Sequence, residues 1–199
     1  LGSLGLAPYN IFVFTIFSLP ITFYLSEKLD GHRKSFYVGF LYGLGFYISS
    51  LYWIAISFKV ANMGGYFLGT LAVLILCFFL SFFFALAFYF IKRWSIKDNT
   101  FLNCLLIIII FSSFDWIKGN ILWGFPWTPI SVIWSSHSST LAPFSYIGVW
   151  GYSLVTFSLI LGIYLLYKNI RLSIYFFLPF ILVFSLSNFI PKKTYSIVE

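Results

Sequence analysis

The sequence predicts an all-α polytopic membrane protein, and two observations lead to that fold class. Hydrophobic residues make up 61% of the 199 positions and charged residues only 9%, with a mean hydropathy of +0.97. Soluble domains carry about 25% charged residues. Uncharged runs at 35–58 and 60–91 also exceed the roughly 20 residues that a helix needs to cross the hydrocarbon layer. Because these runs are continuously apolar rather than alternating, a porin-like barrel is not expected.

The apolar runs predict about six complete spans and the end of a preceding one. We interpret residues 1–7 as the end of that preceding segment or as a short extracytoplasmic lead, with Pro8 in the turn that follows. Pro20 is expected to kink the first complete span. The predicted complete spans are 11–26, 35–58, 66–91, 100–114, 141–167 and 172–190.

Small residues on the second span predict a site of close helix packing. Gly39 and Gly43 are four residues apart, so they share one helix face. Small residues at this spacing let two helices approach closely in lipid. Tyr52 and Trp53 then fall where an aromatic belt would meet the far interface.

The distribution of Lys and Arg predicts the orientation in the membrane. The loops at 27–34, 92–98 and 168–171 hold three, three and two of the twelve basic residues. The alternate loops and the C-terminal tail hold one, one and two. The richer set belongs in the cytoplasm. This placement between spans also argues against nucleic-acid binding, despite the net charge of +7.

The stretch from Asp115 to Pro129 differs from the plain apolar helices around it. It contains one acid, one base, two glycines, two prolines and three of the seven tryptophans. Prolines cannot continue a helix, because they lack the backbone N–H. Irregular backbone at membrane depth is tolerated only where protein buries it or a wet cavity meets it. We therefore expect the membrane domain to open toward a ligand at this stretch.

Asp115 and Lys118 are spaced i, i+3, so they are expected to meet on one helix face. The simpler interpretation is a structural ion pair that neutralises itself near the interface. The alternative is a functional pair that orients the following loop or meets a lipid headgroup, as intramembrane ionisable residues often do.

Aromatic residues and breaks in this region predict a surface that faces lipid or docks another domain. Tryptophan suits either role, because it has an apolar body with a single donor. The same residues could serve only as interface anchors. The residues assigned to lipid access or domain docking are Trp116, Trp123, Gly124, Phe125, Pro126, Trp127 and Trp150.

No catalytic residue, cofactor or metal site is predicted. Cys77 and Cys104 lie inside apolar runs and are interpreted as small buried hydrophobes. His137 lies in a serine-rich loop without the third group that a nucleophile–base pair requires. Two histidines and two cysteines far apart in sequence do not suggest a metal centre.

Taken in order, several of these motifs resemble the membrane domain of the apolipoprotein N-acyltransferase family. The match covers essentially the whole chain. At the positions of Asp115 and Lys118 the family usually has Glu and Arg, and lysine lacks the planar fork of arginine. The motifs are Leu6-Ala7-Pro8-Tyr9, Gly39 through Phe46 with Tyr52-Trp53-Ile54, Asn62-Met63-Gly64-Gly65, Gly124-Phe125-Pro126-Trp127, and Leu141-Ala142-Pro143 through Gly151.

The resemblance implies an acyltransferase of the bacterial inner membrane. Such an enzyme moves an acyl chain from a phospholipid to the N-terminal cysteine of an apolipoprotein, through a thioester in a periplasmic nitrilase-like domain. The family's catalytic Glu, Lys and Cys cannot be placed in this chain, which is therefore expected to be inactive alone. We expect residues 1–193 to form the membrane domain and residues 194–199, which alternate like a strand, to begin a truncated nitrilase-like domain.

Two other interpretations stay open. A fragment of a transporter or lipid flippase would show related halves and a broken helix near the midplane. A purely structural anchor is the third possibility.

Overall fold

The computed structural model describes residues 1–7, 9–121, 124–136 and 140–189. Within these ranges the regular structure is entirely helical. The elements in chain order are η1 (Gly2–Gly5), α1 (Phe12–Lys28), α2 (His32–Leu51), α3 (Trp53–Val60), α4 (Gly65–Trp94), α5 (Thr100–Asn120), η2 (Ile130–Trp134), α6 (Ala142–Leu166) and α7 (Ile170–Phe189).

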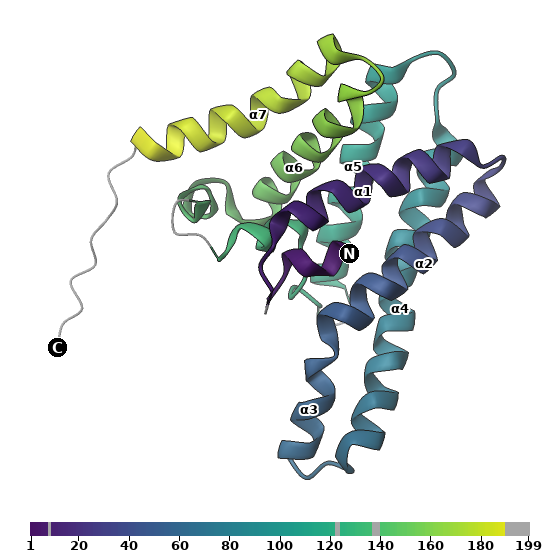
Figure 1. Ribbon diagram of the computed structural model, residues 1–199, viewed down its shortest axis with the longest axis vertical. Helices are drawn as coiled ribbons and strands as arrows, with labels where there is room; N and C mark the ends of the chain where they lie inside the picture. The colour runs from purple at the N-terminus through teal and green to yellow at the C-terminus, as the bar shows by residue number, and fades with distance from the viewer. Residues whose placement is uncertain (8, 122–123, 137–139, 190–199) are drawn as a thin grey trace.

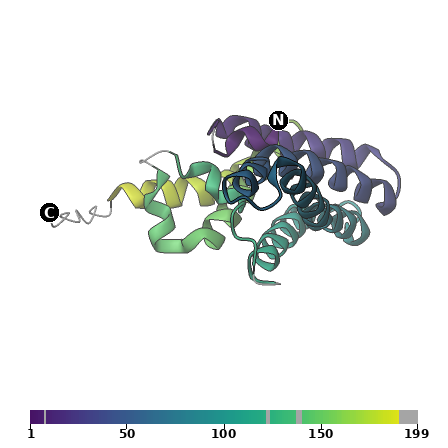
Figure 2. The same ribbon diagram turned by 90° about the horizontal axis from the view of Figure 1, so that it is seen from below.

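The helices form a bundle from which one hairpin projects. α2 packs along α4, and α3 continues beside the first part of α4 at the foot of the molecule (Figure 1). α6 packs against α7, and α1 contacts α6, α2 and η1. Seen from below, α6 and α7 lie on one side of the bundle and α1 and α2 on the other (Figure 2).

The close approach of α2 and α4 depends on the two glycines singled out in the sequence. A Cβ on Gly39 would stand 2.6 Å from the carbonyl oxygen of Phe84. A Cβ on Gly43 would stand 3.1 Å from the Cα of Ser81. Lipid tails are as apolar as the helix surfaces, so packing of this kind, rather than the hydrophobic effect, holds membrane helices together.

Two apolar clusters fill the bundle. The first joins α1, α4, α5 and α6 through aromatic contacts, such as the edge-on contact of Phe23 with Phe111 at 5.5 Å between ring centroids. The second joins α2, α4, η2 and α6 around Tyr47, Leu80 and Tyr152. The two clusters hold the free thiols of Cys104 and Cys77, respectively.

The expected count of six spans is not confirmed. Among the described residues α4, α5 and α6 are long and apolar enough to cross a membrane. α2 and α3 add a fourth only if they count as one span, and they are bent by 41° relative to each other. α1 has 17 residues, about 25 Å of helix, against a hydrocarbon layer of about 30 Å. The apolar part of α7, Ile170–Leu186, is also shorter than the candidate spans α4, α5 and α6.

Several expected boundaries differ in the structure. Residues 2–5 form one turn of 3₁₀ helix instead of ending an α-helical span. α5 continues to Asn120, six residues past the predicted end at 114. α6 is interrupted at Gly148, which has a φ of +65° that a side chain would disfavour. The strand expected at 194–199 and the loop around His137 lie outside the described residues.

Candidate functional site

The end of α5 is a tight reversal of the chain. The N–H of Ile121 still donates to the carbonyl of Ile117 at 2.8 Å, and the N–H of Phe125 returns to the carbonyl of Lys118 at 2.8 Å. Gly124 makes the reversal possible, with a φ of +76°. A Cβ at this position would also stand 2.3 Å from the carbonyl oxygen of Gly119. The loop is therefore folded back onto the helix that precedes it.

The Lys118 ammonium is buried at this reversal, and its N–H groups donate to protein acceptors. Its Nζ lies 2.7 Å from Oδ1 of Asp115, 2.9 Å from the carbonyl oxygen of Thr128 and 3.4 Å from the Thr128 hydroxyl. Only 4% of the lysine side chain and 8% of the aspartate side chain are exposed. A buried charge without such partners would be costly. The ion pair therefore fastens the loop residue Thr128 to α5.

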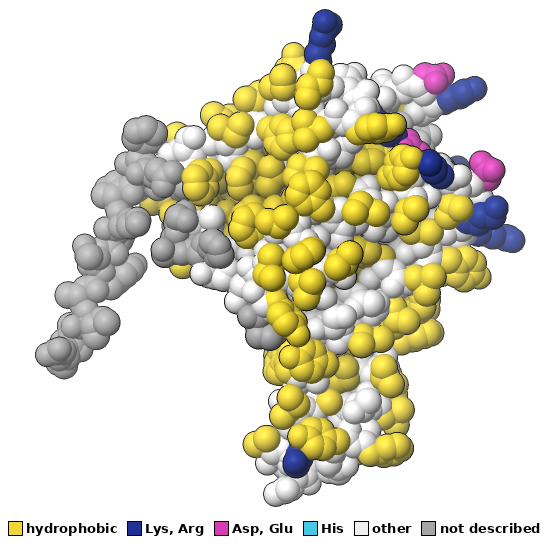
Figure 3. All heavy atoms as spheres, viewed as in Figure 1, with side chains coloured by type: hydrophobic (Ala, Val, Ile, Leu, Met, Phe, Trp, Pro, Cys, Tyr) yellow, Lys and Arg dark blue, Asp and Glu magenta, His cyan; other side chains and the backbone are white. Residues whose placement is uncertain are grey.

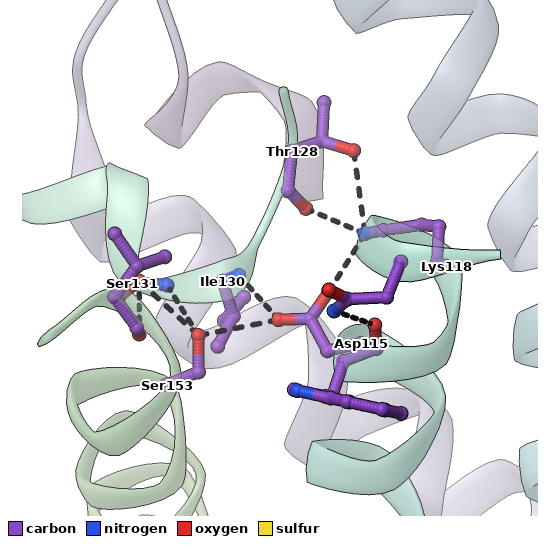
Figure 4. Close-up of polar contacts among 9 residues, drawn as sticks. Asp115, Lys118, Thr128, Ile130, Ser131 and Ser153 are labelled. Carbon is purple, nitrogen blue, oxygen red and sulfur yellow. Dashed lines mark hydrogen bonds and ion pairs between the residues drawn. The ribbon is translucent and has the colours of Figure 1, made fainter. Parts of the chain in front are cut away.

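The second carboxylate oxygen of Asp115 binds two other elements. It accepts the N–H of Ile130, the first residue of η2, at 3.1 Å and the hydroxyl of Ser153 in α6 at 3.2 Å. Ser153 also contacts the hydroxyl of Ser131, which donates to the carbonyl of Val149 (Figure 4). One buried acid thus holds the end of α5, the start of η2 and the middle of α6 in a fixed arrangement.

A cavity of about 30 Å³ adjoins the ion pair. Its walls include the rings of Tyr47 and Phe111 besides Asp115, Lys118 and Thr128. The Tyr47 ring centroid lies 5.8 Å from the lysine ammonium, within the range of a cation–π contact. A space of this size can hold a water molecule but not a headgroup. Little free space therefore lies beside the buried pair, and its structural role stays a prediction.

The tryptophans singled out in the sequence divide between two places. Trp116 and Trp150 line one open groove of about 550 Å³ between α5 and α6, together with Ser112, Ser113 and Leu154. Trp116 is 52% exposed. The Trp150 ring lies against Gly119, where an added Cβ would stand 2.3 Å from the ring.

Trp127 lies away from this groove. It is 54% exposed and stacks on Trp53 of the projecting hairpin, with ring centroids 5.3 Å apart. The centroid of the Phe125 ring lies 5.5 Å from that of the Trp127 ring. Pro126 is exposed in the turn between Phe125 and Trp127. Trp123 lies outside the described residues. The grouping of all these residues in one lipid-facing or docking surface stays a prediction.

Sequence reasoning missed the partners that complete the network. Ser131 and Ser153 belong to other elements, and the backbone N–H of Ile130 carries no sequence signal. Only Thr128 lay within the stretch already singled out. A hydroxyl residue inside an apolar span, such as Ser153, is the one available hint, because it needs a partner there.

The described residues contain no cluster of the side chains that most often bind metal ions. Nowhere in these ranges do three His, Cys, Asp or Glu side chains gather closely enough to bind one. The carboxylate of Asp115 has its acceptors occupied by protein donors. The arrangement can orient neighbouring elements, and its chemistry is that of a satisfied buried ion pair.

Comparison with known proteins agrees on one family. Residues 1–162 match the family described as "Apolipoprotein N-acyltransferase N-terminal domain". Three curated proteins named apolipoprotein N-acyltransferase are similar to the chain. The protein of Rhodopseudomonas palustris is 27% identical over 161 residues, covering 78% of this chain and 30% of the relative. The protein of Rickettsia prowazekii is 28% identical over 159 residues, with the same two coverages.

The third relative, from Vibrio vulnificus, is 30% identical over 168 residues, covering 81% of this chain and 31% of its own length. The chain thus spans about 30% of the length of the relatives that it matches. The family match extends over well more than half of the chain. On this evidence the chain belongs to the apolipoprotein N-acyltransferase family, whose N-terminal domain it contains.

Proposed function

We propose that this chain is the membrane part of a phospholipid-to-apolipoprotein N-acyltransferase of the bacterial inner membrane. In this proposal the chain anchors a nitrilase-like catalytic domain and shapes the path by which lipid reaches it. The observation that carries the proposal is the position of Trp116 and Trp150. Both line one open groove between two candidate spans, next to the buried ion pair that holds the loop after α5.

The groove suits the upper part of an acyl chain or a lipid glycerol. Its floor is apolar, and its tryptophans combine an apolar face with one N–H donor. Such residues are favoured where hydrocarbon meets water. Ser113, which is exposed, adds a hydroxyl to the same wall. A lipid in this groove would lie within the bilayer and beside the fixed loop.

The ion-pair network supports the second half of the proposal, which is anchoring. It ties the loop to α5 and α6, and the exposed ring of Trp127 in this loop stacks on Trp53, so we infer that these two rings form the docking platform. A catalytic domain docked on a rigid platform keeps its reactive groups at a fixed height above the lipid. By the distribution of Lys and Arg, we assign this loop to the periplasmic side.

The proposed reaction has two covalent steps in the catalytic domain. A cysteine thiolate attacks the ester carbonyl of a phospholipid, and a thioester forms as the lyso-phospholipid alcohol leaves with a proton. The amino group of the lipoprotein's N-terminal cysteine then attacks the thioester. An amide forms and the thiol is regenerated. The present chain contributes the positioning of the lipid and supplies none of the reacting groups.

A chimera tests the proposal directly. Residues 1–193 would replace the matching N-terminal part of the Rickettsia prowazekii relative, and the product would be assayed with a phospholipid and a diacylglyceryl-cysteine peptide. We expect the peptide mass to increase by one acyl group. A chimera that is present in the membrane in normal amount but does not acylate the peptide would contradict the proposal.

The groove is tested in the same chimera. Trp116→Ala and Trp150→Ala should each lower kcat/KM for phospholipid about fivefold, mainly through KM, because an aromatic contact of about 1 kcal/mol is lost. Trp94→Ala is the matched control, since Trp94 is exposed at the end of α4 outside the groove. Equal losses in all three variants would argue against a lipid path at this groove.

Two helix breaks among the described residues, the one at Gly148 in α6 and the 41° bend between α2 and α3, are features that a transporter or lipid flippase would share. Transporters place broken helices near the bilayer midplane. Gly148 is instead the seventh residue of a 25-residue helix and so lies near one end. Lipid scrambling by the purified protein in vesicles would support the transporter, and its absence together with acyl transfer would support the enzyme.

A further inference from the structure

A second polar cavity lies at the end of the bundle where α1, α4 and α6 end and α5 begins. We call it the basic-end cavity. Its volume is about 150 Å³, and it is not part of the ion-pair network around Asp115. Charged side chains gather over this part of the molecule, along the upper right of Figure 3. Its polar lining includes Glu27, Lys92, Thr100, Asn103, Tyr164 and Lys168.

The charges that line the cavity do not balance. Glu27 is the one carboxylate in the lining, and it is engaged by the Lys168 ammonium and by the Tyr164 hydroxyl, which donates at 2.6 Å. Lys92 donates to the backbone carbonyl of Glu27 at 3.1 Å. Neither ion pair found among the described residues includes Lys92. The cavity therefore carries one cation in excess of its acid.

The rest of the lining is arranged for an amphiphile. The first turn of α5 begins at Thr100, and the N-terminal end of a helix favours anions. Asn103 bonds both backbone groups of Ile96, at 2.7 and 2.8 Å, and so fixes the loop between α4 and α5 at the mouth of the cavity. The inner wall is apolar and is formed by Phe23, Phe88, Ile91 and Ile107.

The cavity also opens to the exterior. The Glu27 side chain is 52% exposed and that of Lys168 is 28% exposed. The volume is about five times the share of one water in the liquid, about 30 Å³, so a headgroup fragment can enter. Positive charge at the mouth, apolar side chains behind it and a position at the helix ends match a phospholipid lying in one leaflet.

We propose that the basic-end cavity binds the phosphate of an anionic phospholipid headgroup, with Lys92 as its main cationic contact. The phosphate pairs with the Lys92 ammonium while Glu27 stays paired with Lys168. The glycerol and first methylenes lie against the apolar inner wall. This site is toward the opposite end of α5 from the groove lined by Trp116 and Trp150, and the two share no lining residue. The bound lipid would fix the depth of this end of the bundle in the leaflet on the side of the basic loops.

Native mass spectrometry of the complete protein that carries this chain tests the proposal. The protein would be taken from nanodiscs that contain phosphatidylglycerol and phosphatidylethanolamine. We expect one retained phosphatidylglycerol, and Lys92→Ala should lower its retention about fivefold, as expected for one basic residue at a membrane surface. Arg93→Ala is the matched control, because Arg93 is exposed next to Lys92 but does not line the cavity. It should change retention less than about twofold, because an exposed charge that does not contact the phosphate is screened by salt.

Glu27→Gln gives a second result of opposite sign. Removing the only acid in the lining and freeing Lys168 should increase retention of the anionic lipid. A purely structural role of the cluster predicts a loss instead. The proposal would be overturned by equal losses in Lys92→Ala and Arg93→Ala, or by a loss in Glu27→Gln. Displacement by millimolar glycerol phosphate with no retained lipid would overturn the assignment to a membrane lipid.

Discussion

Asp115 in α5 accepts a hydrogen bond from the hydroxyl of Ser153 in α6 at 3.2 Å, across 38 residues of sequence. The other oxygen of the same carboxylate pairs with Lys118 at 2.7 Å. The acid is thus shared between its own helix and a partner helix. Because both of its oxygens are bound to protein, the lengths and directions of these contacts set how α5, η2 and α6 meet.

The buried ion pair predicts strong coupling between its two residues. Asp115→Asn or Lys118→Met alone leaves an uncompensated polar or charged group and should cost about 3–5 kcal/mol of unfolding free energy. The double variant should cost clearly less than the sum, because it leaves no buried charge unpaired. Denaturant unfolding in detergent micelles measures the unfolding free energies of the two single variants and of the double variant. Simple additivity would show that the two side chains do not depend on each other.

The contact of α2 with α4 predicts different effects for two glycines of one helix. Gly39→Ala should destabilise the protein by about 1–3 kcal/mol, because its Cβ would meet the Phe84 carbonyl. Gly45→Ala should be at least as stable as the parent, since nothing lies within 4 Å of that Cβ and alanine favours helix. Thermal unfolding of both variants in the same detergent compares them. Equal stability would contradict the observed α2–α4 packing.

The contact of Gly119 with Trp150 predicts a rescue. Gly119→Ala should cost about 1–3 kcal/mol, because the new methyl group would overlap the indole ring. In a Trp150→Leu background the same substitution should cost less than about 0.5 kcal/mol, since the ring is absent. The readout is the melting temperature of the four proteins of this cycle. An undiminished cost in the Trp150→Leu background would place the strain elsewhere.

The cluster at Glu27 predicts a small dependence of stability on pH. Burial raises the pKa of Glu27, but the hydrogen bonds from Lys168 and Tyr164 outweigh it, so its pKa lies below the ordinary 4.5. A carboxyl that is a stronger acid in the folded state stabilises the fold above its unfolded pKa. That contribution is lost as the pH falls through the folded value.

Comparison of the parent protein with Glu27→Gln measures this contribution. Since the carboxylate is about half exposed, the difference in unfolding free energy at pH 7 should be below about 1 kcal/mol. It should disappear when the pH is lowered well below the ordinary pKa of the carboxyl. A difference that grows as the pH falls would contradict the lowered pKa of Glu27 in the folded state.

Local patterns predicted the parts of the fold that depend on neighbours in sequence. The three long apolar helices follow from the length of their apolar runs. The spacing of Asp115 and Lys118 placed them on one face, because a helix brings residues three apart together. The spacing of Gly39 and Gly43 likewise predicted a close helix contact, which α4 makes. Periodicity did not predict the bend between α2 and α3.

By itself, the sequence determined that this is a helical membrane protein and which residues share a helix face, since both depend on local composition and helical geometry. Only the tertiary structure decided that Ser153 and Thr128 complete the ion pair, and that Trp150 joins Trp116 while Trp127 stacks on Trp53. These contacts join distant segments, so they depend on how whole helices pack. Helix packing is a balance of many weak contacts that no short stretch of sequence contains.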